Sequence, residues 1–345
     1  MYKFLVRPLL FLIDPERVHH LVTSLLKIIF RIPGMAKIVS GFFSYKHPVL
    51  RKTVFGLNFD NPVGLAAGFD KNAESYHEFS KLGFGFIEIG TVTPKGQPGN
   101  EKPRLFRLPT DKALINRMGF NNNGALEAVE KLKKKNTSLI IGGNLGKNTA
   151  TLNEDAVKDY LYSFNQLYHV VDYFVVNVSC PNISDLHKLQ DKDSLLEILQ
   201  ALVKERGNYT TYKPILLKIS PDLNFHQIDD VIQISKETSI DGIVATNTTI
   251  TRDNLQTPAP KVQKFGNGGL SGLPLKERST EIIRYIHQKT SGTLPIIGVG
   301  GIMSAKDAME KFKAGASLVQ IYTGFIYEGP SLIKKINKAY VNNYI

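Results

Sequence analysis

Eight short apolar runs, separated by stretches of helical spacing, constrain the fold of this 345-residue chain most strongly. The runs are almost continuously apolar, which is typical of strands buried on both faces of a parallel sheet. They are Pro62–Ala67, Phe84–Ile89, Leu139–Gly142, Tyr173–Val178, Ile215–Ile219, Gly242–Ala245, Ile296–Val299 and Leu318–Ile321. Helical spacing follows several of them, at 125–135, 194–205, 225–237, 275–289 and 305–314. Eight such units predict an α/β fold of the (β/α)8 TIM barrel type. A doubly wound open sheet is the alternative.

The first 42 residues differ from the rest of the chain. Asp14 is a good N-cap and Pro15 a good first helical residue, and Pro33-Gly34 would end the helix. Apolar residues recur between them at helical spacing: Val18, Leu21, Val22, Leu25, Leu26 and Ile29. A shorter helix carrying Leu5, Leu9 and Leu12 is expected before it. The sequence therefore predicts a two-helix extension over 1–42 and a barrel domain over 43–345.

The extension is also basic. Residues 1–52 hold nine Lys and Arg but only Asp14 and Glu16 as acidic residues, within a net charge of +12 for the chain. Basic, apolar-faced helices are suited to the surface of an anionic membrane, and a helical cap packed on the barrel is the alternative. No apolar run approaches the roughly 20 residues needed to span a bilayer.

Polar or glycine-rich residues follow every predicted strand. In a (β/α)8 barrel these positions meet at one end, where active sites lie. The residues are Ala67-Gly68 with Lys71, Thr91, Asn144, Asn177, Lys218, Thr246 with Asn247 and Thr248, Gly300-Gly301, and Tyr322-Thr323. The glycines after the last two strands, with Gly268–Gly272, favour a phosphate cradle, because backbone N–H groups can approach an anion there. Simple turns are the alternative for each glycine cluster taken alone.

Three residue types at these strand ends suggest chemistry. Lys218 sits late in an apolar strand, so it must face either an anionic ligand or a buried carboxylate. Six asparagines, Asn116, Asn121, Asn122, Asn177, Asn182 and Asn247, offer donors and acceptors suited to a planar imide, although some are expected to cap loops. Cys180, the only cysteine, is either a reactive base or a small buried hydrophobe. A single cysteine excludes an internal disulfide or a cysteine-based metal site.

The chain resembles the dihydroorotate dehydrogenase family over essentially its whole length. The matching segments are 61–71, 87–94, 103–108, 115–122, 245–249, 268–272, 297–302 and 320–324. The N-terminal extension resembles that of the class 2, quinone-dependent branch. The resemblance implies an FMN flavoprotein that oxidises dihydroorotate to orotate in pyrimidine biosynthesis, with a quinone as acceptor. It also implies peripheral contact with the cytoplasmic face of the cell membrane, a monomer, no metal and no nucleic acid.

The resemblance assigns residues to three sites. FMN would be held by Ala67, Gly68, Thr91, Asn144, Asn177, Lys218, Thr246, Gly269, Gly301, Tyr322 and Thr323. Substrate would be held by Lys71, Asn116, Arg117, Met118, Gly119, Phe120, Asn177, Asn182, Asn247 and Thr248. The quinone tunnel would include His19 and Arg107.

The base position departs from the branch. The resemblance implies that Cys180 removes the C5 proton, whereas class 2 members usually carry serine there and class 1 members cysteine. Class 2 members typically continue Thr-Pro-Gly-Leu-Arg, but this chain reads Ile183-Ser184-Asp185-Leu186-His187. We hypothesise that a thiol, which ionises more readily than a hydroxyl, makes the missing threonine relay dispensable.

Three alternatives stay open at this point. A class 1 enzyme that uses fumarate or NAD is the nearest, and the extension argues against it. An FMN barrel acting on another pyrimidine is the second. A non-catalytic membrane-surface module is the third, but it would leave the polar strand ends unexplained.

Overall fold

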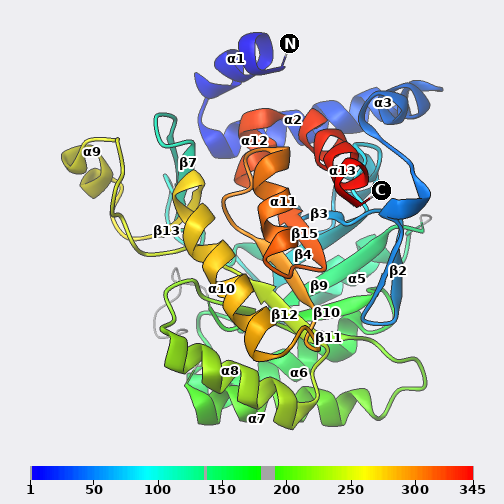
Figure 1. Cartoon of the computed structure of the whole chain (residues 1–345), viewed down its shortest axis with the longest axis vertical. Helices are drawn as coiled ribbons and strands as arrows, with labels where there is room; N and C mark the ends of the chain where they lie inside the picture. The colour runs from blue at the N-terminus through cyan, green and yellow to red at the C-terminus, as the bar shows by residue number, and fades with distance from the viewer. Residues whose placement is uncertain (1, 136–137, 180–190, 345) are drawn as a thin grey trace.

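The computed structural model describes residues 2–135, 138–179 and 191–344. Its centre is a closed barrel of eight parallel strands in the spatial order β10-β11-β12-β14-β15-β3-β4-β9 (Figure 1). The strands are β3 (Val63–Leu65), β4 (Phe86–Val92), β9 (Ile140–Leu145), β10 (Tyr173–Asn177), β11 (Ile215–Ile219), β12 (Gly242–Ala245), β14 (Ile296–Val299) and β15 (Leu318–Ile321). Each predicted apolar run supplies one of them. The (β/α)8 prediction is confirmed, and the open sheet is excluded.

Helices surround the barrel on its outer side (Figure 1). They are α4 (Tyr76–Ser80), α5 (Ala125–Leu132), α6 (Ala156–Leu167), α7 (Lys192–Arg206), α8 (Phe225–Thr238), α10 (Lys276–Lys289), α11 (Ala305–Lys313), α12 (Thr323–Glu328) and α13 (Ser331–Tyr344). All five predicted helical stretches are helices, with ends shifted by a few residues. Outward-facing strand residues such as Ile87, Val176 and Ile243 pack with these helices in one large apolar core.

A hairpin of β1 (Lys52–Val54) and β2 (Leu57–Phe59) closes the N-terminal end of the barrel. Its two turn residues, Phe55 and Gly56, both have positive φ, as the type I′ turn of a tight hairpin requires. Val54 and Phe59 pack with the side chains that begin the barrel strands, including Phe86 and Tyr173. The barrel interior is therefore a filled core at this end.

Large rings inside the barrel lie directly over glycines of neighbouring strands. A Cβ at Gly64 would lie 2.4 Å from the Phe86 ring, and one at Gly142 would lie 2.2 Å from the Tyr173 ring. Side chains at these two positions would displace the rings. This pairing of small with large residues fills the interior of the barrel around Phe86 and Tyr173.

The extension forms a layer of helices at one end of the molecule (Figure 1). A π-helical turn (Tyr2–Val6) runs into α1 (Arg7–Phe11), and α2 spans Pro15–Arg31. The predicted cap is confirmed, because the Asp14 side chain accepts hydrogen bonds of 3.0 Å from the N–H groups of Glu16 and Arg17. The sequence did not anticipate α3 (Met35–Phe43), which restarts after Gly34 in a left-handed conformation. The extension thus has one helix more than predicted.

Smaller elements build the rim at the C-terminal end of the barrel. A three-stranded sheet has the order β13 (Gly269–Gly272), β7 (Ala113–Asn116), β6 (Leu105–Leu108). β5 (Lys95–Gln97) pairs with β8 (Asn122–Gly124). The long segment 248–274 holds α9 (Ala259–Lys264) and β13. β13 bonds to β7 from more than 150 residues away, so the rim joins distant parts of the chain.

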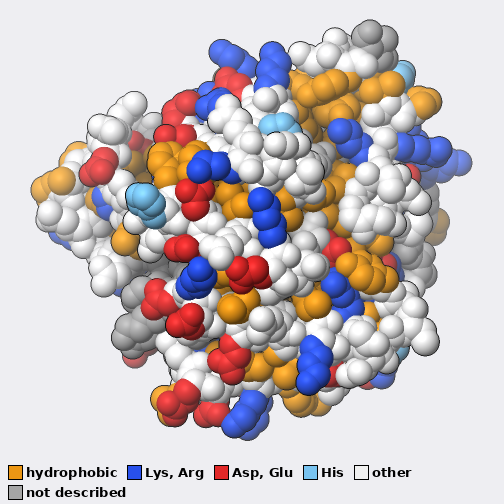
Figure 2. Space-filling view, turned by 60° about the horizontal axis from the view of Figure 1, so that its bottom comes forward, with side chains coloured by type: hydrophobic (Ala, Val, Ile, Leu, Met, Phe, Trp, Pro, Cys, Tyr) orange, Lys and Arg blue, Asp and Glu red, His pale blue; other side chains and the backbone are white. Residues whose placement is uncertain are grey.

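The face at the α6–α8 end of the molecule carries many charged side chains. Figure 2 brings the α6–α8 end of Figure 1 forward and shows basic and acidic side chains interspersed with small hydrophobic patches. By contrast, most of the exposed large hydrophobic side chains in the described residues belong to the extension: Phe4, Leu5, Val6, Leu9, Leu12, Ile13, Leu21, Leu25, Ile28, Ile32, Ile38 and Phe42. The extension is therefore the apolar face of the molecule.

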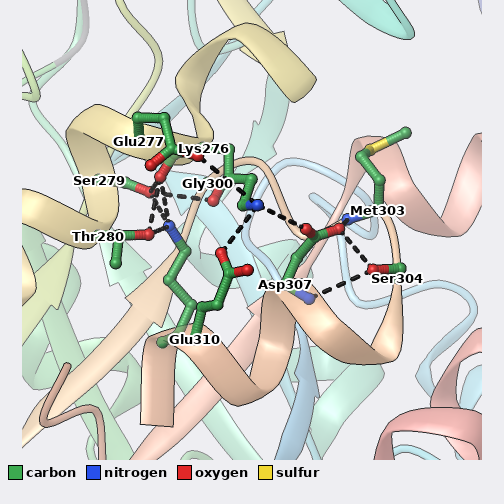
Figure 3. A network of polar contacts seen from close by, with 10 residues as sticks. Lys276, Glu277, Ser279, Thr280, Gly300, Met303, Ser304, Asp307 and Glu310 are labelled. Atoms are coloured by element: carbon green, nitrogen blue, oxygen red, sulfur yellow. Dashed lines mark hydrogen bonds and ion pairs between the residues drawn. The ribbon is translucent and has the colours of Figure 1, made fainter. Parts of the chain in front are cut away.

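A buried lysine supports the loop after β14 from behind. Lys311, fully buried on α11, donates hydrogen bonds to the Lys276 carbonyl (2.8 Å), to Thr280 Oγ1 (2.6 Å) and to Ser279 Oγ. Ser279 Oγ in turn donates to the Gly300 carbonyl at 2.9 Å (Figure 3). Lys276 Nζ pairs with Asp307 (3.1 Å) and Glu310 (2.8 Å), which joins α10 to α11. The loop after β14, which contains Gly300 and Gly301, is thus held by a network of polar contacts.

Burial lowers the pKa of Lys311 to about 7. Because its pKa in the unfolded chain is higher, the unfolded state binds more protons between about pH 7 and pH 10. We therefore expect the unfolding free energy of the native protein to rise with pH relative to Lys311→Met, by at most about 1.4 kcal/mol per pH unit. Melting temperatures of both proteins at pH 6.5, 8 and 9.5 would test this. Parallel pH profiles would contradict it.

Candidate active site

A cavity opens at the C-terminal end of the barrel, with about 1000 Å³ of empty space including its mouth. It brings together most of the residues predicted to bind cofactor: Ala67, Gly68, Thr91, Asn177, Lys218, Thr246, Gly301, Tyr322 and Thr323. It also brings together most of those predicted to bind substrate: Lys71, Asn116, Met118, Gly119, Phe120, Asn177, Asn247 and Thr248. The two predicted sets therefore share one cavity.

Several predicted residues stand apart from this cavity wall. Asn144 lies one layer behind it, with no exposed surface. Gly269 accepts a hydrogen bond from Asn116 Nδ2 at 3.3 Å. The Arg117 side chain points away, because its guanidinium donates to the Pro103 carbonyl and stacks over Phe106. His19 is on α2 of the extension, and Arg107 contacts Phe11 and Ile13 of the extension. Cys180 and Asn182 lie outside the described residues.

Lys218 has a buried carboxylate partner, which the sequence left as one of two possibilities. Its Nζ lies 3.6 Å from Glu88 Oε1, and the Glu88 side chain is completely buried on β4. Glu88 also accepts hydrogen bonds from Asn144 Nδ2 (2.8 Å) and Gln320 Nε2 (2.7 Å). Lys218 nevertheless lines the cavity, so its side chain presents a positive charge there while Glu88 stays buried behind it.

The Glu88 carboxylate also fixes the direction of a chain of amides. It can only accept, so Asn144 must turn its Nδ2 toward it and its Oδ1 away. Asn144 Oδ1 then accepts from Thr91 Oγ1 (2.6 Å) and Asn177 Nδ2 (3.3 Å). This leaves Asn177 Oδ1 to accept from Asn247 Nδ2 at 3.3 Å. The orientation of the amides in the wall is thus determined by one buried charge.

The opposite wall comes from the rim segment 116–121. Phe120 has a positive φ of 53° and is buried, and Lys71 Nζ donates to Asn121 Oδ1. Gln97 Nε2 donates to the carbonyls of Gly119 (3.0 Å) and Phe120 (3.3 Å). Asn116 therefore lines the cavity from a rim segment that Gln97 holds, and Lys71, from the loop after β3, bonds to the same segment.

Small residues line the remaining end of the cavity. Gly272, Gly300, Gly301 and Gly324 meet there, and Ser271 Oγ lies 2.8 Å from Thr323 Oγ1. Gly300 and Gly301 have φ values of 120° and 70°, so side chains there would be strained. Tyr322 also lines the cavity, and burial raises the pKa of its phenol to about 12. The glycine-rich loops expected from the sequence thus reach one wall.

His19 on α2 and Arg107 on β6 lie where the extension meets the rest of the chain. The His19 ring packs edge-to-face on Phe69 at 5.1 Å, and Phe69 packs on Tyr322 at 5.2 Å. Burial, together with the positive charges of His20 and Lys71, lowers the pKa of His19 to about 4. Arg107 donates to the Ile13 carbonyl at 2.6 Å and lies over the Phe11 ring. His19 is therefore neutral at physiological pH.

Sequence reasoning missed two functional residues of the barrel, Glu88 and Gln320. Both interrupt an otherwise apolar strand, Phe86–Val92 and Leu318–Ile321, and this interruption was the signal that could have identified them. Leu275 and Met303 also line the cavity without having been predicted. Nothing in their local sequence distinguishes them from ordinary rim residues.

Comparisons with known proteins agree with this architecture. The family model described as dihydroorotate dehydrogenase matches residues 49–342. A protein of Christiangramia forsetii named dihydroorotate dehydrogenase (quinone) is 56% identical over 338 residues, covering 98% of each chain. One of the same name from Synechococcus sp. (strain JA-3-3Ab) is 48% identical and covers 97% of this chain and 91% of its own.

A solved structure gives the same result. The crystal structure of DHODH from Eimeria tenella in complex with ferulenol superposes with a TM-score of 0.85 and 36% sequence identity. The match covers 96% of this chain and 91% of that one. With the eight-stranded barrel, its amide-lined cavity and the N-terminal helices in place, the chain belongs to the dihydroorotate dehydrogenase family.

Proposed function

We propose that this protein oxidises dihydroorotate to orotate in pyrimidine biosynthesis, with FMN as cofactor and a quinone as electron acceptor. The observation that carries the proposal is the shared cavity, which is lined by Lys218, Asn177 and Asn247 and also by Lys71 and Asn116. Relatives of nearly the same length named dihydroorotate dehydrogenase (quinone) support it.

The residues present suit FMN. A flavin needs hydrogen-bond partners along one edge of its ring system, a positive charge near that edge, and a narrow anion site for its phosphate. Thr91, Asn177, Thr246 and Lys218 supply the first two, and the backbone of Gly300, Gly301 and Gly324 supplies the third. When bound, FMN would accept the hydride that leaves C6 of dihydroorotate and pass two electrons to a quinone.

Substrate would lie between the barrel amides and the rim. Dihydroorotate combines an imide with a carboxylate, and the facing side chains offer complementary groups. Asn116, Asn177 and Asn247 would bind the imide and ring carbonyls, and Lys71 would attract the carboxylate. Phe120 and Met118 would cover the substrate and exclude water.

Cys180 is our proposed base for the C5 proton. It follows Ser179, which is described and buried, and whose Oγ accepts a 3.0 Å hydrogen bond from Asn247 Nδ2. The segment after β10 therefore starts beside the proposed substrate amides. A thiolate at position 180 would take the proton as the hydride leaves C6, which balances the removal of two hydrogens.

The extension would deliver the quinone and contact the membrane. No helix in the described residues combines the length and apolarity needed to cross a bilayer. The exposed apolar side chains of α1, α2 and α3, beside Lys3, Arg17 and Lys27, instead favour peripheral contact with an anionic surface. A neutral His19, packed on Phe69 and through it on Tyr322, would border the path from the membrane to the flavin.

The acceptor provides the first test. Dihydroorotate should bleach the yellow protein without oxygen, and ubiquinone or menaquinone analogues should restore its colour. Fumarate and NAD should not, because the extension supplies an apolar path to a membrane quinone. Absorbance near the flavin maximum measures both steps. Turnover with fumarate or NAD at the quinone rate would favour the class 1 alternative.

The base provides the second test. Cys180→Ala should keep its FMN but lose at least about 100-fold in the rate of flavin reduction by dihydroorotate. In the native protein that rate should rise with pH through a thiol ionisation near pH ~8.5. Cys180→Ser serves as the comparison and should react poorly, because Ile183 offers no hydroxyl relay. Normal reduction of Cys180→Ala would end the assignment.

The quinone path provides the third test. His19→Ala should slow reoxidation by a quinone analogue about tenfold, because an edge-to-face ring contact contributes about 0.5–1.5 kcal/mol. Reduction by dihydroorotate should be unchanged. Ser24→Ala is the matched control, because Ser24 is exposed on the same helix. Equal rates for both variants in the quinone step would remove His19 from the path.

A further inference from the structure

A buried arginine links the extension to the barrel. Arg104 is 6% exposed and makes two hydrogen bonds to Glu16 on α2, from Nη2 to Oε1 (2.7 Å) and from Nε to Oε2 (3.3 Å). Glu16 is the one carboxylate that pairs with Arg104 in the described part of the chain. Lys102 also lies 3.3 Å from Glu16, but its side chain is 64% exposed. Of the two basic residues that pair with Glu16, Arg104 is therefore the buried one.

The same guanidinium holds a rim segment of the barrel. Arg104 Nη1 donates to the carbonyls of Pro98 (2.6 Å) and Asn100 (2.8 Å). Because the guanidinium is planar and rigid, hydrogen bonds on both of its edges fix the position of α2 relative to segment 98–100. Segment 98–100 and helix α2 are thus held by one side chain.

Segment 98–100 in turn holds the rim wall of the cavity. Asn100 N–H donates to the Met118 carbonyl (3.1 Å), and Asn100 Nδ2 donates to the Arg117 carbonyl (3.0 Å). The contact is close, because a Cβ on Gly99 would lie 2.2 Å from the Met118 oxygen. Met118 and its neighbour Gly119 line the cavity. The two segments therefore have little room to move independently.

The negative charge of Glu16 is what keeps the Arg104 guanidinium in its buried position. Burial alone would raise the pKa of Glu16, but the hydrogen bonds and charges of Arg104 and Lys102 outweigh it and lower that pKa. Glu16 therefore stays ionised opposite Arg104. A buried guanidinium that loses its carboxylate partner is strongly disfavoured. It would turn toward water and release the Pro98 and Asn100 carbonyls.

We infer that Glu16 is a positioning residue for dihydroorotate: through Arg104 and Asn100, the N-terminal extension holds Met118 and Gly119 in place at the substrate cavity. The inference rests on the proposed function. It gives the extension a part in substrate binding, separate from its proposed part in the quinone step.

Glu16→Gln tests this, because it keeps the shape of the side chain and removes its charge. Anaerobic flavin reduction should be measured over a range of dihydroorotate concentrations. The dissociation constant should rise on the order of tenfold, the cost of one weakened charged hydrogen bond. The limiting reduction rate should change less, and reoxidation by a quinone analogue should stay as in the native protein.

Lys27→Gln is the matched control. Lys27 lies on the same helix and approaches Glu74 at 4.0 Å, but it has no contact with segment 98–104 among the described residues. It should bind dihydroorotate normally. If Glu16→Gln fails to retain FMN, Glu16→Asp gives the same measurement with the charge kept and the reach shortened by one methylene.

Two results would overturn the inference. The first is an unchanged dissociation constant for dihydroorotate in the Glu16 variant. The second is an equal slowing of the quinone step, which would indicate that the extension as a whole has loosened. Failure of the native protein to be reduced by dihydroorotate would instead overturn the proposed function.

Discussion

The completely buried carboxylate of Glu88 is the constraint on which the site depends. It sits on β4 and is satisfied by groups from three other barrel strands: Asn144 on β9, Lys218 on β11 and Gln320 on β15. Because a carboxylate only accepts hydrogen bonds, each partner has one permitted orientation. The barrel thereby presents a fixed cation and a directed series of amides, with little reorganisation left for the moment of reaction.

The two walls of the cavity are built differently. The barrel wall is part of a continuous strand lattice and a filled core, so its geometry follows from the fold itself. The rim wall is a loop, and its position depends on contacts with β5, with segment 98–100 and, through Arg104, with α2. Precision on that side therefore comes from side-chain contacts between parts of the chain that are distant in sequence.

The sequence predicted the barrel well because strands buried on both faces leave an unmistakable apolar pattern. It also indicated most of the cavity, since residues that follow parallel strands must meet at one end. It could not pair Lys218 with Glu88, because no local pattern tells which buried carboxylate a lysine will meet. The restart at α3 was hidden behind Pro33-Gly34, which usually marks an end. Arg117 lies within a matching motif, yet its side chain points away from the cavity toward Pro103. The role of Cys180, outside the described residues, stays a prediction.

The β1–β2 hairpin affects the routes by which ligands can reach the cavity. Val54 and Phe59 pack against the start of the barrel strands, so the hairpin closes the N-terminal end of the barrel. We therefore expect ligands to reach the cavity from its rim at the C-terminal end. On the proposed function, the charged, water-soluble dihydroorotate and an apolar membrane quinone would use different parts of that rim. The hairpin lies far from the cavity, but by closing the other end of the barrel it would leave both molecules to share this rim.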